Sequence, residues 1–366
     1  SLPELTPGAE PDVMGYDCVI ELRRATAAGP WSARWVMPAE QGVELRLPAL
    51  PDAAEEVFVG SAPAHRRPPK ENVDIGKRMT WLCRRTQGEA PLSSAFASVI
   101  EALPAGATGG VNARRLAVDA PPECGAVAIE VTHAGGRDLF VIARTAGAVE
   151  VAEAGLRMDG RIGLVALDRD GAVIGALLLD GTALSAGGVT LTAEGPSPTG
   201  EIVALPEGII DEPLVIDANL PLPAASAGRT LTMAHANHTG SAWTIARAEP
   251  LAHGGARLTL DRSACEGVGR VGRLSEDGAV LFANAGFRQL EAGLSALFYD
   301  GAWLSAGGTR VPVRAVAHHG RGEPWLHKAT LAEPLSAADA PAGAAFTISR
   351  VAVGDRVVVP NVIAWP

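Results

Sequence analysis

Hydrophobic and polar residues alternate in short runs along almost the whole chain, and turn residues separate these runs. One predicted strand carries Ile162, Leu164 and Ala166 on the same face. A period of two is typical of a strand with one buried face, whereas the longer period of a helix is almost absent. We therefore expect an all-β protein, with Ser336–Ala340 as one short helix that Ser336 caps.

Asp-Gly pairs mark the predicted turns, because this dipeptide tolerates the positive φ angles of a tight hairpin. Asp170-Gly171 is expected to join the strand above to a partner at Val173–Leu179, and Asp277-Gly278 to join a second pair. Asp180-Gly181 and Asp300-Gly301 are expected to form two more turns. Stacked antiparallel sheets, in a multi-sheet β-sandwich, are the natural way to bury so many strands.

A short internal echo and a Pro- and Ala-rich stretch suggest how the chain is divided. The sequence DGTALSAGG at 180–188 returns as DGAWLSAGG at 300–308. Either one hairpin turn type used twice or a duplicated sandwich would produce this echo. The stretch at 221–228 is a candidate boundary. We predict a main β-sandwich region at 1–220 and a second, smaller β-domain at 221–366.

Composition excludes several classes of function. The 366 residues carry a formal net charge of −10, which argues against a nucleic-acid partner. No apolar run approaches the ~20 residues that a membrane span requires. Four scattered Cys without CxxC spacing predict neither a metal site nor a cofactor, and leave one disulfide open. The chain starts at Ser1 without signal-peptide features, so we expect it to be cut from a longer protein.

Two early segments are similar to a known enzyme family. They are GYDCVIELRRATAAGPWSARW at Gly15–Trp35 and TWLCRRTQGEAPLSSAFASVIE at Thr80–Glu101. Together they resemble the late β-sandwich region of heparinase II/III-like polysaccharide lyases. The resemblance continues more weakly through 127–138, 160–191 and 258–271, and GDRVVVPNVI at Gly354–Ile363 looks like the last strand of such proteins. The specificity of the match lies in the order of these segments.

The resemblance implies an enzyme of two parts. Members of this family join an N-terminal α/α toroid to sheets and cleave uronic-acid linkages by β-elimination, with a Tyr and a His on the toroid. This chain has no toroid helices and no His-x-His-x-x-Asp-like cluster near its start, and neither Tyr16 nor Tyr299 matches a family context. We therefore expect the C-terminal β portion of a lyase, inactive by itself, with catalytic residues unknown.

This expectation names partners and a location. The partners are an acidic polysaccharide, such as a glycosaminoglycan, and the α/α toroid of the same enzyme. The location is periplasmic or secreted. A non-catalytic carbohydrate-binding module and a purely structural β-domain are the alternatives.

The best candidate for polysaccharide binding is a basic stretch in the first region. It contains Arg66, Arg67 and Lys70 in a Pro-rich loop, and continues through Lys77, Arg78, Arg84 and Arg85. Guanidinium groups bind carboxylates with two parallel hydrogen bonds, which suits an anionic sugar. A solvated loop that serves solubility, or that contacts the toroid, would have the same composition.

Four further residues are candidates for chemistry. Trp303 follows a turn, and an exposed indole there would stack on a sugar ring. His235 and His238 have H-x-x-H spacing, but on a strand they would point to opposite faces, so no metal site is predicted. Ser263 lacks both a nucleophile elbow and a nearby His, so it is rejected as a nucleophile.

Overall fold

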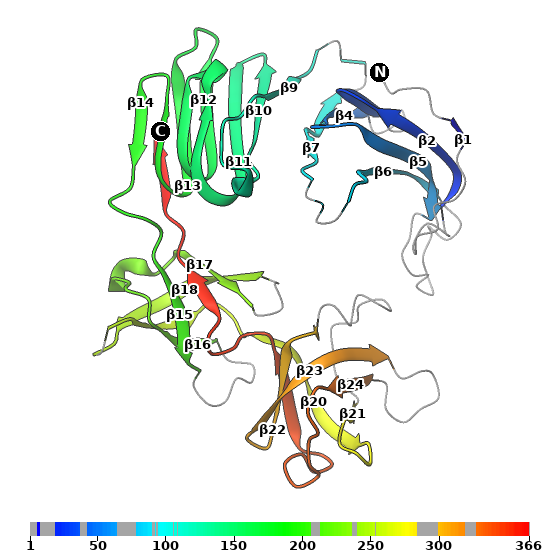
Figure 1. Cartoon of the computed structure of the whole chain (residues 1–366), viewed down its shortest axis with the longest axis vertical. Coiled ribbons are helices and arrows are strands. Elements are labelled where there is room, and N and C mark those ends of the chain that lie inside the picture. Colours follow the sequence, from blue (N-terminus) through cyan, green and yellow to red (C-terminus); the bar gives the residue numbers. More distant parts are fainter. Residues whose placement is uncertain are drawn as a thin grey trace. The chain divides into compact units, whose positions relative to one another are not determined.

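The computed structural model describes the chain at 6–7, 19–36, 42–63, 78–89, 92, 94–104, 106–107, 109–205, 213–235, 240–252, 254–283, 299–318 and 327–365. The chain forms two compact units, one of 1–195 with 362–366 and the other of 196–361. Antiparallel sheets dominate both units, as the alternating sequence predicts (Figure 1). The described part also contains three short 3-10 helices, η2 (Pro122–Cys124), η3 (Ala152–Ala154) and η4 (Ala224–Ser226).

Two facing sheets form a sandwich at the start of the first unit. One sheet contains β1 (Thr6–Pro7), β2 (Ile20–Ala27), β5 (Glu55–Pro63) and β6 (Arg78–Arg85). The other contains β3 (Trp31–Val36), β4 (Val43–Leu50), β7 (Ala97–Ser98) and β8 (Glu101–Pro104). Ala27 and Val57 from the first sheet share a buried cluster with Trp31 and Ala49 from the second. The alternating residues of the two sheets therefore meet as a sandwich core.

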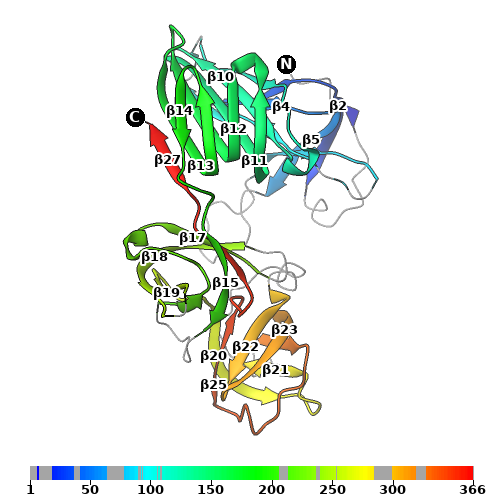
Figure 2. The ribbon, with the colours of Figure 1, turned by 60° about the vertical axis from the view of Figure 1, so that its left-hand side comes forward.

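A single seven-stranded sheet forms the rest of the first unit (Figure 2). Its strands are β9 (Asn112–Leu116), β10 (Val127–His133), β11 (Gly136–Val151), β12 (Leu156–Asp168), β13 (Val173–Ala186), β14 (Val189–Thr192) and, from the C-terminus, β27 (Val362–Trp365). Strand β27 pairs with β13. It therefore completes a sheet whose first strand begins at Asn112, some 250 positions before Val362.

The three long strands of this sheet bend along one line, which folds the sheet over its own core. The register shifts between Ile142 and Gly147 in β11 and between Asp159 and Gly160 in β12. Residues from both sides of the bend, such as Leu139 and Leu156, belong to one buried cluster. β-Bulges of this kind increase curvature, so the sheet encloses a core without a second sheet.

Glycine is required where β12 and β13 cross this bend. A Cβ atom on Gly181 would lie 2.4 Å from the backbone oxygen of Asp159 and 2.6 Å from the Cα atom of Gly160. Asp180, just before it, has a φ of 53°, a left-handed conformation that Asp adopts more readily than most residues. The predicted turn at Asp180-Gly181 is therefore wrong, because the pair forms a bulge inside a continuous strand.

The second unit contains two closed six-stranded barrels, a closure that the alternating pattern did not reveal. The first barrel contains β15 (Thr199–Ala204), β16 (Val215–Ala218), β17 (Thr230–Ala234), β18 (Gly240–Pro250), β19 (Ala256–Leu260) and β26 (Arg356–Val358). The second contains β20 (Cys265–Leu274), β21 (Val280–Ala283), β22 (Ala302–Ala306), β23 (Thr309–His318), β24 (His327–Leu331) and β25 (Ala345–Ser349).

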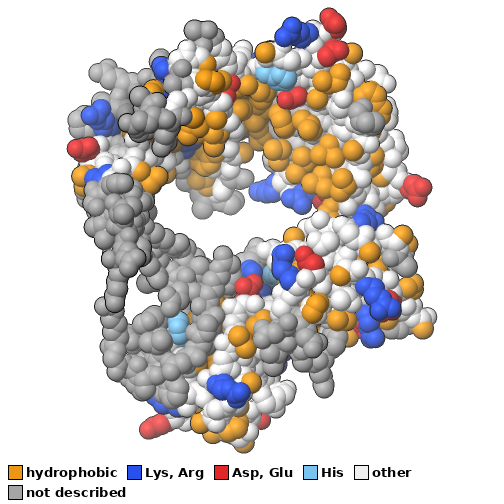
Figure 3. Space-filling model, turned by 180° about the vertical axis from the view of Figure 1, so that it is seen from behind, with side chains coloured by type: hydrophobic (Ala, Val, Ile, Leu, Met, Phe, Trp, Pro, Cys, Tyr) orange, Lys and Arg blue, Asp and Glu red, His pale blue; other side chains and the backbone are white. Residues whose placement is uncertain are grey.

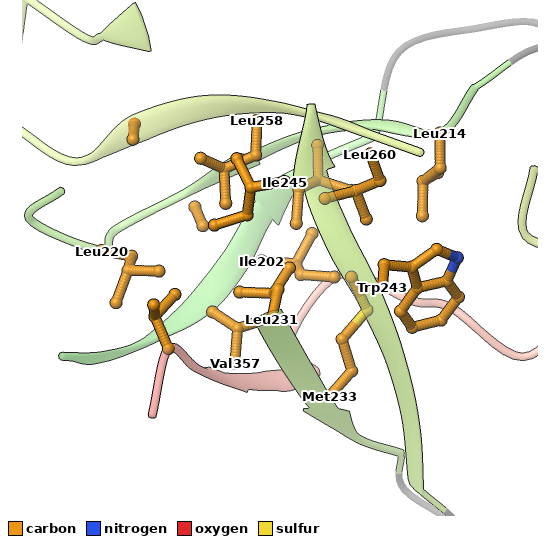
Figure 4. Packing of buried hydrophobic residues seen from close by; sticks show 14 of the residues in the cluster. Ile202, Leu214, Leu220, Leu231, Met233, Trp243, Ile245, Leu258, Leu260 and Val357 are labelled. Carbon is orange, nitrogen blue, oxygen red and sulfur yellow. The ribbon is translucent and has the colours of Figure 1, made fainter. Parts of the chain in front are cut away.

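Each barrel has its own hydrophobic core. In the first, Leu231, Ile245 and Leu258 point toward one another in the interior (Figure 4). In the second, Leu281 and Ile348 lie in the corresponding cluster. Closing each sheet on itself removes its exposed edges and places the inward-facing residue of each alternating strand in a shared core.

The division between the compact units falls at 195/196, whereas the sequence suggested 220/221. The Pro- and Ala-rich stretch lies inside the first barrel, and Leu220 and Leu222 on either side of the expected boundary are part of its core. The stretch forms η4, which precedes β17. The stretch is therefore part of the first barrel and not a linker between units.

Three of the four predicted Asp-Gly turns are confirmed. Asp170-Gly171 and Asp277-Gly278 join β12 to β13 and β20 to β21, as expected, and Asp300-Gly301 is also a turn. The echoed sequences end in the same two-residue turn, since the paired glycines of both have φ angles of 56° and 84°. The predicted helix at Ser336–Ala340 is only a single turn, although the Ser336 hydroxyl accepts the expected capping hydrogen bond from the backbone N–H of Asp339.

Candidate functional site

The predicted polysaccharide-binding residues have different outcomes. Arg66, Arg67 and Lys70 lie outside the described residues. Trp303 lies in β22 and is half-buried, and the guanidinium carbon of Arg310 lies 4.7 Å from the centre of its ring. One face of the indole is therefore covered by a cation and does not lie open to a sugar.

The described end of the basic stretch is held by partners within the sandwich. Arg84 donates to the buried carboxylate of Glu55 at 2.9 Å, and Glu55 also accepts from the indole N–H of Trp31 at 2.7 Å. Arg85 lies 2.6 Å from Glu56 on the neighbouring strand. These ion pairs link β5 to β6. The residues of the basic stretch that are still candidates for ligand binding therefore precede β6 in the sequence.

Tyr299 does not offer the accessible phenol that the lyase resemblance requires of the toroid. Tyr299 is fully buried, and its hydroxyl donates to the backbone oxygen of Glu266 at 3.4 Å. Tyr16 lies outside the described residues.

A Ser-His-Asp arrangement, which sequence reasoning missed, lies at one end of the first barrel. The Nδ1 atom of His235 lies 2.7 Å from the Oδ2 atom of Asp355. On the other side of the ring, Nε2 lies 2.5 Å from the hydroxyl oxygen of Ser241. The side chains of His235 and Asp355 are only 2% and 4% exposed, whereas Ser241 is half-buried. The hydroxyl thus lies at the outer end of a buried chain of hydrogen bonds.

Strand pairing explains why these three residues meet. The last residue of β17, Ala234, pairs with Gly240 at the start of β18 and with Arg356 at the start of β26. His235 follows Ala234, and Asp355 precedes Arg356, so both lie just beyond the same end of the paired strands. Two neighbouring strand ends therefore bring together residues that are 120 positions apart.

A backbone hydrogen bond helps to fix the carboxylate of Asp355. Its Oδ2 atom accepts a hydrogen bond from the backbone N–H of Ala352 at 2.9 Å. Arg310 donates to the backbone oxygen of Val351 at 2.7 Å. Burial lowers the pKa of Arg310, against the opposing effect of the Asp355 charge.

Of the H-x-x-H pair, the structure describes only His235. This residue binds a carboxylate and a hydroxyl, and His238 lies outside the described residues. Within the described ranges, no group of three or more His, Cys, Asp and Glu side chains is placed to hold a metal ion. No local motif could have revealed the arrangement, because Asp355 reaches it only through the β17–β26 pairing.

A cleft of about 600 Å³ lies on the seven-stranded sheet of the first unit. Its charged lining consists of Asp119, Glu150, Asp159 and Arg157. Arg157 pairs with Glu150 at 3.1 Å, and Asp159 accepts from the hydroxyl of Thr182 at 2.6 Å. Three carboxylates against one guanidinium make this cleft unfavourable for an acidic polymer.

The same sheet exposes two apolar rows on the face opposite its core. Cross-strand partners lie on the same face. One row runs through Ile129, Phe140, Leu164 and Leu177, and the other through Val127, Ile142, Ile162 and Leu179. Hydrophobic side chains gather over the part of the first unit that contains these strands (Figure 3).

This apolar face, defined by the two rows, reaches the surface. Ile142 is 50% exposed, and Val362 of β27, which extends the second row, is 64% exposed. Sheet faces that solvent covers normally carry polar residues, so this face is more apolar than a solvent-covered sheet face usually is.

Comparison with known proteins found no family model that matches the chain and no curated protein that matches it. In the part of the chain that the structure describes, no helix has the length and hydrophobicity needed to cross a membrane.

Proposed function

We propose that this chain is the C-terminal β-sandwich portion of a heparinase II/III-like polysaccharide lyase, which acts by β-elimination on a uronic-acid-containing polysaccharide. The order of the resembling segments supports the family. The antiparallel sheets agree with a β region of such an enzyme. Catalysis then requires the α/α toroid, which supplies the base and the acid. The site of action is periplasmic or secreted, where such polymers occur.

The apolar face carries this proposal. Its two rows place about eight large apolar side chains, without a charged residue among them, across four neighbouring strands. Burial of such side chains against a partner contributes about 25 cal/mol per Å² of apolar surface. The toroid is the partner that the resemblance provides. Arg66, Arg67 and Lys70 then remain the candidate contacts for the acidic polysaccharide.

The first experiment uses the protein expressed from its full natural reading frame. Denaturing mass spectrometry shows whether a helix-rich segment or chain accompanies this one. The purified species is then assayed on uronic-acid polysaccharides by the ultraviolet absorbance of unsaturated products. Activity that depends on both parts supports the proposal. If this chain is found alone, and no unsaturated product forms with any such polymer, the lyase proposal fails and a carbohydrate-binding or structural module replaces it.

A variant then tests the apolar face directly. Ile142→Glu places a charge in the middle of the second row, at a side chain exposed enough to tolerate it in the isolated chain. We expect it to weaken association with the toroid about 10-fold or more, because burying the new carboxylate is costly. Binding is measured by titration of the two purified parts.

The matched control is Val353→Glu, which adds the same charge at a 56% exposed residue of the second unit. It should leave the affinity unchanged. Equal affinities of the Ile142→Glu variant and the unmodified chain would show that the apolar face does not bind the toroid.

A further inference from the structure

The Ser241–His235–Asp355 arrangement has the geometry of a nucleophile, a general base and an orienting carboxylate. In such triads the carboxylate accepts the N–H of one ring nitrogen, and the other nitrogen accepts the proton of the hydroxyl. Both contacts are present here, at 2.7 Å and 2.5 Å. This arrangement is independent of the lyase proposal, since it involves the second unit alone.

The surroundings select the tautomer that this chemistry needs. Asp355 accepts from the backbone N–H of Ala352, so its carboxylate is held in place. A carboxylate is an acceptor, and therefore Nδ1 of His235 carries the proton. The Nε2 atom is left with its lone pair toward the hydroxyl of Ser241. Burial of His235 and Asp355 strengthens both contacts, because water does not compete for them.

We propose that Ser241 is the nucleophile of a second, hydrolytic site that cleaves small carboxylic esters, with His235 as general base and Asp355 as the residue that positions it. Ser241 is half-buried at the start of β18, between Gly240 and Ala242. These neighbours carry no side chain larger than a methyl group, so they place little bulk beside the hydroxyl.

The reaction balances with water as the only co-reactant. The oxygen of Ser241 adds to the ester carbonyl carbon while Nε2 of His235 takes the hydroxyl proton. The carbon–oxygen bond to the alcohol breaks, and the alcohol leaves with that proton. Water then adds to the acyl-enzyme with the help of His235, the bond to Ser241 breaks, and the carboxylic acid is released.

An alkyl fluorophosphonate tests whether Ser241 is activated. The probe forms a phosphorus–oxygen bond with an activated serine and loses fluoride. The intact chain is incubated with the probe, and the modified peptide is identified by mass spectrometry. We expect modification at Ser241, and hydrolysis of p-nitrophenyl acetate that Ser241→Ala abolishes.

The matched control is Ser263→Ala in the same unit. Ser263 is also half-buried, but its hydroxyl accepts only the backbone N–H of Cys265 in the contacts that the structure gives it. This variant should keep full labelling and esterase activity. His235→Gln should slow labelling about 100-fold or more, the usual contribution of a general base.

Asp355→Asn separates positioning from stability. It keeps the side-chain shape but presents an amide to the ring, so we expect labelling at Ser241 to slow about 100-fold or more in protein that is still folded by circular dichroism. The unmodified chain decides the question even if every variant unfolds. If its Ser241 reacts no faster than Ser263, the three residues are a structural link between strands, and the proposal is wrong.

Discussion

At the scale of single residues, paired charges hold the seven-stranded sheet, and Glu130 shows their effect most clearly. Its side chain is 9% exposed and accepts from Arg114 at 2.7 Å and from Arg137 at 3.2 Å. The hydrogen bond from Arg114, followed by the charges of both guanidinium groups, lowers the pKa of Glu130 in spite of its burial. The folded state thus binds a proton at this carboxylate less readily than the unfolded chain does.

The lowered pKa of Glu130 therefore makes the free energy of unfolding rise with pH in the acidic range. Its contribution is complete above the ordinary glutamate pKa of about 4.3 and is lost as the pH falls through the lower folded value. We expect Glu130→Gln to lower the free energy of unfolding by about 1–2 kcal/mol near neutral pH. The difference from the unmodified protein should shrink toward about pH 3, as measured by urea unfolding at both values.

An exposed ion pair provides the comparison for this prediction. Glu249 pairs with Arg247 at 2.6 Å, but both side chains are largely solvated. Glu249→Gln should change stability by less than about 0.5 kcal/mol at either pH. A constant difference between Glu130→Gln and the unmodified protein across the pH range would contradict the role assigned to the Glu130 carboxylate.

At the scale of elements, the bend in the long strands depends on the absence of side chains at two facing positions. A methyl group on Gly181 would collide with backbone atoms of β12, which cannot rotate away as a side chain can. We expect Gly181→Ala to destabilise the first unit by about 1–3 kcal/mol through overpacking. Thermal unfolding followed by circular dichroism measures the loss.

Gly175 in the same strand is the control for this substitution. A Cβ atom there would have Ala166 as its nearest neighbour, at an ordinary 3.8 Å. Gly175→Ala should be neutral, or stabilise by up to about 1 kcal/mol by restricting the unfolded chain. If both alanine variants unfold at the same temperature, the close approach of β12 and β13 does not hold the bend.

The elements also show which parts of the fold were predictable. Alternation and Asp-Gly pairs identified β12–β13 and β20–β21, because a strand with one buried face and a tight turn both leave local signals. The same alternation occurs in sandwiches and barrels, so closure of the second unit was missed. Asp180-Gly181 was wrongly predicted to be a turn for a related reason, because positive φ angles occur in bulges as well as in turns.

The sequence could not reveal the Ser241–His235–Asp355 arrangement for a topological reason. Ser263 is not predicted to be a nucleophile, because it has no His nearby in sequence. Ser241, in contrast, lies six positions after His235, across a hairpin. The third member follows only from the pairing of β17 with β26. Long-range pairing of this kind depends on the whole barrel and leaves no local pattern.

At the scale of the whole molecule, the second unit is inserted between two strands of the first. The chain leaves the seven-stranded sheet after β14, forms both barrels, and returns at Val362 to add β27 beside β13. The pairing joins Ala176–Leu179 to Val362–Trp365 in antiparallel register. The last residues of the chain therefore belong, in folding terms, to a sheet of the first unit.

Removing residues 362–366 should consequently affect one unit and spare the other. The truncation exposes the hydrogen-bonding groups of β13 that β27 covers, and we expect it to cost about 1–3 kcal/mol, the net value of a few backbone hydrogen bonds. Hydrogen exchange followed by mass spectrometry separates the units, because peptides from β13 should exchange faster while peptides from β17 and β22 keep their protection. The barrels have their own buried clusters, so they do not need the sheet for their cores. Faster exchange in the barrels, to the same extent as in β13, would mean that the two units unfold together and that the insertion is not an independent folding unit.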